Sequence, residues 1–448
     1  MKKSVFSLIT TITLLLTIPV ASLYAQGDTS SPYSQYGVGL LGDQSVGMSR
    51  GMNGVGIGLR EQGQVNYLNP ATYSLIDSTT FIFDVAMTMQ TANFKETISQ
   101  GSRSLNSRDA CFEYAVASFR VRKHLGMSFG IMPYSVVGYE YSTKPRTVND
   151  YVQYPMTENK TTVSTQNTGA GGLRMVYIGA GWAISNRLSV GANVNYMWGT
   201  LDNYLVTTYT DSYVKSLSRY YTATISTVKL DFGVNYSLPL DKDNQLTVGL
   251  TYSPGYGMGA SPRCEVVTSN AQSAVNDTTL YKAHNALRLP TSIGAGVSWK
   301  HKNKWLVGLD YTYQGWSKMK AVDYVNEKTG QKMGDDTDGF NDRHKINVGA
   351  QYCRNASGRS FGDRIRYRFG AGYSTSYLQI NDRKGPREIS LSAGVGLPII
   401  NVYNTRSMLN VSFQWVNTNA TGMIRDNTFR INLGLTFNER WFAKWKFD

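Results

Sequence analysis

The sequence predicts an all-β fold: a transmembrane antiparallel β-barrel of about fourteen strands with an N-terminal plug, or hatch, in its lumen. Three observations predict it. Segments of about ten residues alternate apolar and polar side chains, as membrane strands do. The connections between these segments alternate between long and short. A Gly-rich stretch precedes the first strand, which divides the 448 residues into a signal peptide (1–25), a plug (26–78) and a barrel (79–448).

The first 25 residues have the pattern of a secretory signal peptide. A charged start at Lys2 and Lys3 precedes a mostly apolar stretch, and small residues lead to Ala25, with Gln26 as the first mature residue. No cysteine lies near the cut, so a lipoprotein is not expected. The alternative, a membrane anchor, is disfavoured because the apolar stretch is short.

Composition narrows the class of protein and its partners. Aromatic residues make up 12% and charged residues 17%, with 43 glycines, which suits strands with aromatic girdles and a small-residue lumen face. The three cysteines are widely spaced and show no metal-binding or disulfide pattern. The net charge of +14 favours contact with outer-membrane lipids and lipopolysaccharide. No basic run with interleaved aromatics indicates nucleic acid, and a solvated basic surface is the alternative.

The strands are read from period-2 alternation. The segment 188–198 is clear: Leu188, Val190 and Ala192 alternate with Ser189 and Gly191. The other strands are predicted at 81–90, 230–236, 246–252, 292–299, 305–313, 346–352, 367–373, 389–395, 409–415 and 429–437, with weaker members at 112–121, 125–139 and 173–182.

The connections indicate how the barrel is oriented. Long connections are predicted at 93–109, 141–168, 200–221, 254–287, 317–343, 376–387 and 417–427, and short ones at 122–124, 185–187, 239–244, 300–304 and 400–405. Long outer loops and short periplasmic turns are typical of the Gram-negative outer membrane, with both termini periplasmic. A soluble β-sandwich has no reason to alternate in this way. The aromatic chain end, with Trp441 and Phe442, predicts a periplasmic girdle and recognition by the barrel assembly machinery. We expect a monomer.

The Gly-rich stretch admits two interpretations. It contains nine glycines between residues 36 and 71 and closes on Asn69-Pro70-Ala71. A phosphate loop is disfavoured because GxxxxGK[ST] and a following strand–helix unit are missing. A plug is favoured because a barrel of about fourteen strands leaves a lumen to fill.

Here the sequence resembles the FadL family of outer-membrane transporters for long-chain fatty acids and other hydrophobic compounds. The resemblance rests on the Gly-rich stretch ending at Asn69-Pro70-Ala71, on LPTSIGAGVSW at 289–299, on WLVGLDYTYQGW at 305–316 and on the strand number. It implies a hatch gated around Gly51, Gly54, Asn69, Pro70 and Ala71. It also implies a hydrophobic, fatty acid-like ligand that leaves sideways at a kinked third strand, without nucleotide or proton coupling.

Two further sets of residues are candidates for the gate. The third strand contains Gly130, Pro133 and Gly138, which weaken pairing; either a lateral gap or a simple barrel bend explains them. Charges of the plug are expected to latch it to charges of the lumen, and an arginine in the lumen or loops would also suit a carboxylate ligand. The plug charges are Asp43, Arg50, Arg60 and Glu61, and the lumen charges are Asp84, Glu113, Arg174 and Arg368.

Catalysis is not predicted. The four histidines, His124, His284, His301 and His344, fall in predicted turns, loops or strand ends, and neither GxSxG nor HExxH occurs. We therefore expect no enzyme activity, no cofactor and no metal, although Ser and His assembled across strands remain an alternative. Three functions stay open: passive uptake of hydrophobic molecules, a platform or shuttle in a type IX-like protein secretion system, and a structural or adhesive barrel.

Overall fold

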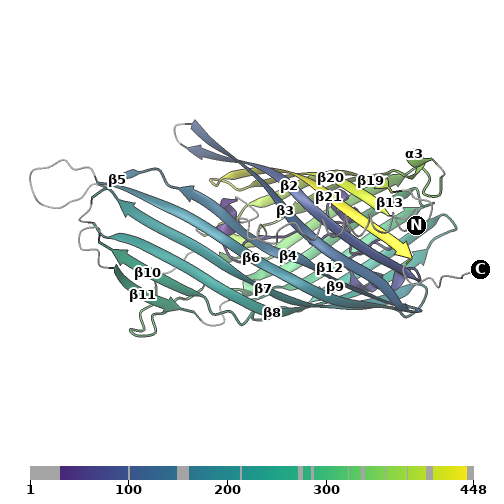
Figure 1. Cartoon of the computed structure of the whole chain (residues 1–448), viewed down its shortest axis with the longest axis horizontal. Coiled ribbons are helices and arrows are strands. Elements are labelled where there is room, and N and C mark those ends of the chain that lie inside the picture. Colours follow the sequence, from purple (N-terminus) through teal and green to yellow (C-terminus); the bar gives the residue numbers. More distant parts are fainter. Residues whose placement is uncertain are drawn as a thin grey trace, which may run out of the picture.

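The computed structural model describes residues 31–98, 101–148, 161–211, 214–270, 276–283, 287–320, 322–333, 339–358, 360–380, 382–399 and 407–440. The predicted signal peptide and the chain end with Trp441 and Phe442 lie outside these residues. Within them, no helix is long and apolar enough to cross a membrane. Most of the described chain consists of strands, which close into an elongated barrel (Figure 1).

Over the described residues, fourteen antiparallel strands form the closed wall, which confirms the predicted fold class. Consecutive wall strands pair, and the last pairs with the first from Thr80↔Arg440 to Lys95↔Arg425. The wall strands are β2 (Thr80–Ile98), β3 (Gly101–Arg122), β4 (Leu125–Ser142), β6 (Thr161–Ala183), β7 (Leu188–Tyr209), β8 (Ser216–Pro239), β9 (Asn244–Ser253), β12 (Thr291–His301), β13 (Trp305–Gly315), β15 (Arg343–Cys353), β16 (Arg366–Ser374), β19 (Arg387–Pro398), β20 (Met408–Asn419) and β21 (Arg425–Arg440).

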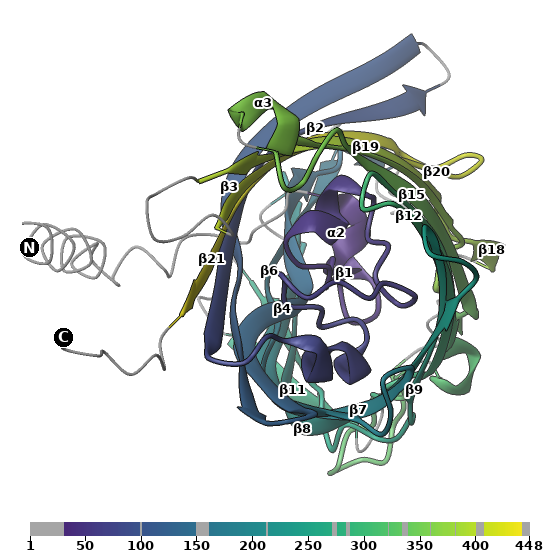
Figure 2. The ribbon, with the colours of Figure 1, turned by 90° about the vertical axis from the view of Figure 1, so that its right-hand side faces the viewer.

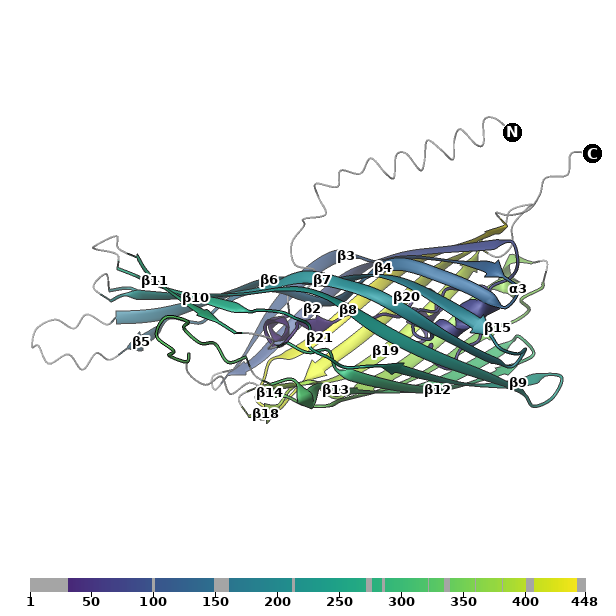
Figure 3. The ribbon, with the colours of Figure 1, turned by 90° about the horizontal axis from the view of Figure 1, so that it is seen from below.

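The two ends of the barrel differ. We call the end with the short connections 123–124, 184–187, 240–243 and 302–304 the turn end, and the opposite one the loop end. At the loop end β6, β7 and β8 run to 23, 22 and 24 residues, although about ten cross a bilayer. They continue past the rim as a sheet joined by three shorter strands (Figure 3). These are β5 (Arg146–Val148), β10 (Arg263–Ser269) and β11 (Asn276–Lys282).

The prediction of loops at 93–109, 141–168, 200–221 and 254–287 is therefore wrong in part, because strands occupy much of these ranges. Their Thr, Tyr and Val residues form strands readily once neighbouring strands supply the pairing, whether or not lipid surrounds them. The remaining loop-end elements are short: η4 (Trp316–Lys318) and a separate small sheet of β14 (Gly339–Phe340), β17 (Leu378–Ile380) and β18 (Arg383–Lys384). The helix α3 (Phe361–Arg364) lies between β15 and β16.

The two faces of the wall have opposite character. Large apolar side chains such as Met87, Ile178, Leu250, Leu309 and Phe369 are about half exposed on the outside. Polar side chains such as Asp84, Asn195, Asn235, Asn347 and Asn410 are buried inside. A closed wall pairs backbone groups within the sheet, which lipid requires.

Residues 31–79 lie inside the barrel, ringed by its strands (Figure 2). We call this segment the plug. It contains the 3₁₀ helix η2 (Pro32–Gln35), the strand β1 (Leu40–Leu41), the short helix α2 (Met48–Gly51) and the 3₁₀ helix η3 (Pro70–Leu75). It begins near the loop end, where Ser31 donates to Asp426, and ends at the turn end, where η3 packs on β6 and β7.

Candidate functional site: the seam between β3 and β4

The barrel wall is interrupted between β3 and β4. The two strands pair from Arg122↔Leu125 at the turn end only as far as Ala115↔Ile131. Beyond that point the described part of β3 pairs with β2 alone, and the outer part of the β2–β3 hairpin leans out of the ring (Figures 1 and 2). We call the gap between residues 101–114 of β3 and 132–142 of β4 the seam. Unpaired strand edges are costly at membrane depth, so the seam needs a cover.

The plug covers the β4 side of the seam. Its strand β1 pairs antiparallel with β4 through Leu40↔Val136 and Leu41↔Ser135. The Gly42 amide donates to the Tyr134 carbonyl at 2.8 Å. Near the loop end, the Ser34 hydroxyl lies 3.1 Å from both the amide nitrogen and the carbonyl oxygen of Gly138. The plug thus pairs with the part of the β4 edge that β3 does not pair with.

The three small or cyclic residues singled out on the third wall strand lie at this gap. Gly130 pairs with Val116 in the next-to-last rung between β3 and β4. Pro133 follows, and the register between β4 and β6 shifts between Pro133 and Ser135. Proline has no amide hydrogen to donate, so β4 can leave the regular ladder here without losing a bond.

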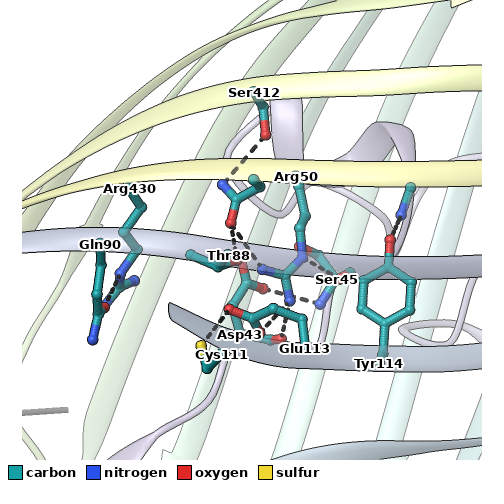
Figure 4. Close-up of polar contacts among 12 residues, drawn as sticks. Asp43, Ser45, Arg50, Thr88, Gln90, Cys111, Glu113, Tyr114, Ser412 and Arg430 are labelled. Carbon is teal, nitrogen blue, oxygen red and sulfur yellow. Dashed lines mark hydrogen bonds and ion pairs between the residues drawn. The ribbon is translucent and has the colours of Figure 1, made fainter. Parts of the chain in front are cut away.

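The plug also holds the β3 side of the seam. Arg50 on α2 forms an ion pair with Glu113 of β3, with Nη2 and Oε2 2.9 Å apart and the side chains 6% and 14% exposed. Its guanidinium lies 5.3 Å from the centre of the Tyr114 ring. The Gly47 amide donates to the Tyr114 hydroxyl at 2.7 Å (Figure 4). Because Glu113 and Tyr114 directly precede the last rung at Ala115, the plug bridges the seam.

Arg50 also organises its own loop. It donates to the carbonyls of Asp43 at 3.0 Å and Ser45 at 3.1 Å. Burial alone would raise the pKa of the Asp43 carboxyl, but the positive charges of Arg50 and Lys345 hold it below its usual range. Asp43 is therefore ionised near neutral pH and accepts a hydrogen bond from the Ser45 amide at 2.9 Å.

A second anchor lies across the lumen on β13. The Asp310 carboxylate accepts three consecutive plug amides, from Gly56 at 2.6 Å, Ile57 at 2.8 Å and Gly58 at 3.3 Å. Hydrogen bonds to a carboxylate are stronger than neutral ones, so this cradle fixes the plug backbone. Sequence reasoning missed Asp310, although a lone carboxylate on the lumen face of an otherwise apolar strand is a usable signal.

The Asn69-Pro70-Ala71 turn lies against the wall near the turn end. Asn69 is fully buried; its Oδ1 accepts the Ala71 amide at 3.2 Å, and its Nδ2 donates to the carbonyls of Ile57 at 2.8 Å and Val234 at 3.1 Å. A Cβ on Gly233 would lie 2.2 Å from Asn69 Oδ1. The wall therefore has a glycine, Gly233, at the position where the Asn69-Pro70-Ala71 turn approaches most closely.

The remaining predicted residues are distributed as follows. Gly51 ends α2, and Gly54, with φ +81°, follows it. Arg60 donates to Asn235 at 3.1 Å, and Glu61 pairs with Lys300 at 2.7 Å. Asp84 and Arg368 are buried in the lumen.

Arg174 is exposed on the outer face of the barrel, so the prediction that it lies in the lumen is wrong. In this part of β6, Leu173 and Met175 point inward instead, because the wall packs there on apolar plug residues.

A cavity of about 410 Å³ opens beside the seam at the loop end. Two of its aromatic rings, Tyr139 and Tyr141, come from β4, with centroids 5.9 Å apart. Tyr36 of the plug, Tyr204 of β7 and Phe340 of β14 line other sides. The lining is aromatic with hydroxyl groups at intervals, which suits a flat or elongated apolar ligand.

The comparison with protein families decides the classification. The model of the family described as BamG matches residues 3–448. The chain belongs to the BamG family. No curated protein matches this BamG-family chain.

Solved structures share the fold of this BamG-family chain. A structure described as the CymD monoaromatic hydrocarbon channel has a TM-score of 0.57 at 16% identity, covering 88% of this chain and 98% of its own. The Ralstonia pickettii toluene transporter TbuX gives 0.57 at 13% identity, covering 90% and 98%. A Pseudomonas aeruginosa FadL homologue gives 0.57 at 9% identity, covering 91% and 100%. The FadL resemblance is therefore confirmed at the level of fold.

Proposed function

We propose that this BamG-family protein carries hydrophobic small molecules, including fatty acid-like ones, passively across the outer membrane, with the plug as the gate. The observation that carries the proposal is the seam: β3 and β4 part at Ala115 and Ile131, and the plug contacts both sides of the gap. Solved structures of the same fold are described as hydrocarbon channels and toluene transporters, which supports the proposal.

The route runs from the loop-end cavity along β4 to the seam. A ligand held between Tyr139 and Tyr204 lies against plug residues 35–37, which directly precede the turn into β1. The pairing of β1 with β4 spans only two residues. Short pairings open at low free-energy cost compared with whole strands. When β1 leaves β4, the ligand passes sideways into lipid, and no nucleotide or cofactor takes part.

The orientation follows from the same proposal. The loop end faces outside and the turn end faces the periplasm, with both termini periplasmic after removal of residues 1–25. The outward apolar side chains contact outer-membrane lipids and lipopolysaccharide. The barrel assembly machinery inserts the chain, which acts as a monomer without a metal or catalytic centre. Within the described residues, no group of three His, Cys, Asp or Glu side chains is arranged to hold a metal.

A disulfide across β1 and β4 tests the gate. Leu41 and Ser135 are direct partners, and antiparallel partners lie at a distance that a disulfide spans. In a chain whose Cys111, Cys264 and Cys353 are changed to Ser, we expect oxidised L41C/S135C to lose uptake of oleate and toluene. Reduction should restore it.

The matched control is S164C/T208C, which joins two residues already paired between β6 and β7. It should transport equally well in both redox states. Unchanged uptake by oxidised L41C/S135C would remove the plug from the gate and contradict the proposal.

A platform for secreted proteins is the second candidate, and the loop-end sheet favours it. β6, β7 and β8 extend well past the rim and carry β10 and β11 beside them (Figure 3). Transport of small molecules does not require such an extension. Co-purification of secreted cargo that is lost when residues 263–282 are replaced by a short linker would support this function over the first.

A further inference from the structure

A buried arginine without a carboxylate partner lies in the turn-end half of the lumen. Arg368 on β16 is 1% exposed. Its Nε donates to Gln351 Oε1 at 2.8 Å and its Nη1 to Asn410 Oδ1 at 2.6 Å. Its Nη2 contacts Met408 Sδ at 3.3 Å, a weak acceptor. Among the residues that the structure describes, no carboxylate forms an ion pair with it.

The carboxylate of Asp84 accepts hydrogen bonds from groups other than Arg368. Asn410 donates to the Thr436 hydroxyl at 3.0 Å, and Thr436 donates to Asp84. Asp84 also accepts the Tyr114 hydroxyl at 2.9 Å. Two neutral side chains therefore stand between Arg368 and Asp84. A buried charge left without a counter-ion costs stability, so its presence calls for a compensating anion.

Arg368 lies in the wall of a cavity with a basic lining. A cavity of about 860 Å³ reaches Arg368 from the turn end. Arg366 lies on the same face of β16, two residues nearer the turn end, as strand geometry places it. The lining carries five cationic side chains and two carboxylates: Arg60, Lys300, Arg364, Arg366 and Arg368 against Glu61 and Asp77. Glu61 is paired with Lys300, and the other four cationic side chains of the lining are all arginines.

We propose that the turn-end cavity binds a ligand bearing a carboxylate or phosphate group, with Arg368 as the anchor and Arg366 as the second contact. A guanidinium presents paired donors in a plane and matches both anions. Met48 and Leu75, which also line the cavity, give the ligand an apolar wall. The site lies at the opposite end of the plug from the aromatic cavity and does not depend on the transport proposal.

The test uses the full mature chain in a maltoside detergent, with inorganic phosphate and succinate as probes and chloride at equal ionic strength as reference. We expect phosphate, succinate or both to raise the thermal unfolding midpoint above that in chloride. Titration calorimetry with the same probes gives the dissociation constant. A response to phosphate alone identifies a phosphate site, and one to succinate alone a carboxylate site.

Three variants locate the binding. R368M should weaken binding at least tenfold, and R366Q at least threefold. R122Q changes an exposed arginine at the turn end that does not line the cavity, so it should bind like the wild type. Equal behaviour of both probes and chloride with the wild type overturns the proposal, as does unchanged affinity in R368M. If R368M does not fold, unchanged affinity in the half-buried R366Q overturns it.

Discussion

The ion pair between Arg50 and Glu113 is one of the contacts through which the plug holds β3. Both are nearly buried, so removing one charge leaves the other without its partner in a poorly hydrated place. We expect E113Q to lower the free energy of unfolding by about 3 kcal/mol. Urea unfolding in lipid vesicles measures it.

The exposed pair between Lys302 and Asp243 serves as the control, since its side chains are 50% and 49% exposed. D243N should change stability by less than about 0.5 kcal/mol. If E113Q proves as stable as D243N, the ion pair does not fasten the plug.

Asp310 holds the plug through three backbone amides rather than through a charged partner. D310N keeps one acceptor oxygen but turns an NH₂ group toward amide donors. We expect a loss of about 2 kcal/mol and faster hydrogen exchange at Gly56, Ile57 and Gly58. Exchange in those amides that matches the wild type would show that the carboxylate charge is not needed.

Some residues of the candidate site could be predicted from the sequence, and others could not. Asn69 and Arg50 were recognisable because Asn before Pro and a charge in a Gly-rich segment are local features. The partners of Asp310 and Tyr114 were not, since they lie 252–254 and 67 positions away in the chain. Such contacts follow from how the barrel closes around the plug, which no local pattern encodes.

At the scale of elements, β4 is the strand on which the proposed gate depends. Gly130 sits where a side chain has no room: its Cβ would lie 2.6 Å from the Ala115 carbonyl and 2.7 Å from Val116 Cγ1. G130A should therefore break the last rungs between β3 and β4 and lengthen the seam. Hydrogen exchange in nanodiscs should rise at least tenfold at amides 115–119.

Gly257 offers a matched control, because an added Cβ there would meet nothing within 4 Å. G257A should leave exchange and stability unchanged or slightly improved. Equal exchange in G130A and G257A would mean that the rungs at Gly130 do not define the end of the seam.

The wall strands were predictable because alternation between lipid and lumen is a strong constraint on every residue of a strand. The loop-end extensions of β6, β7 and β8 were not predictable. Beyond the lipid-facing part of the barrel, nothing requires these strands to alternate apolar and polar residues. β1 was also beyond prediction: two leucines in a Gly-rich segment become a strand only when β4 offers an unpaired edge.

For the molecule as a whole, the plug depends on contacts with the wall more than the wall depends on contacts with the plug. Among the described residues, thirteen of the fourteen wall junctions pair strand to strand along the barrel, whereas the junction of β3 and β4 is completed by the plug. The barrel therefore closes without the plug everywhere except at the seam. The plug has no comparable independence, since its buried Asn69, Arg50 and Gly56 bond to wall residues.

Deleting residues 26–78 separates these two contributions. The polar lumen face would fill with water, and β4 would lose its only cover at the seam in the described chain. We expect the variant to reach the outer membrane and to conduct ions in planar bilayers, where the wild type stays closed. Cells should also become sensitive to vancomycin, which we expect the plugged barrel to exclude. A folded variant that conducts no more than the wild type would mean that the strands close the lumen alone. If the deletion variant does not assemble, the plug would instead be needed for folding, as a template that holds β4 in place while β3 pairs with it.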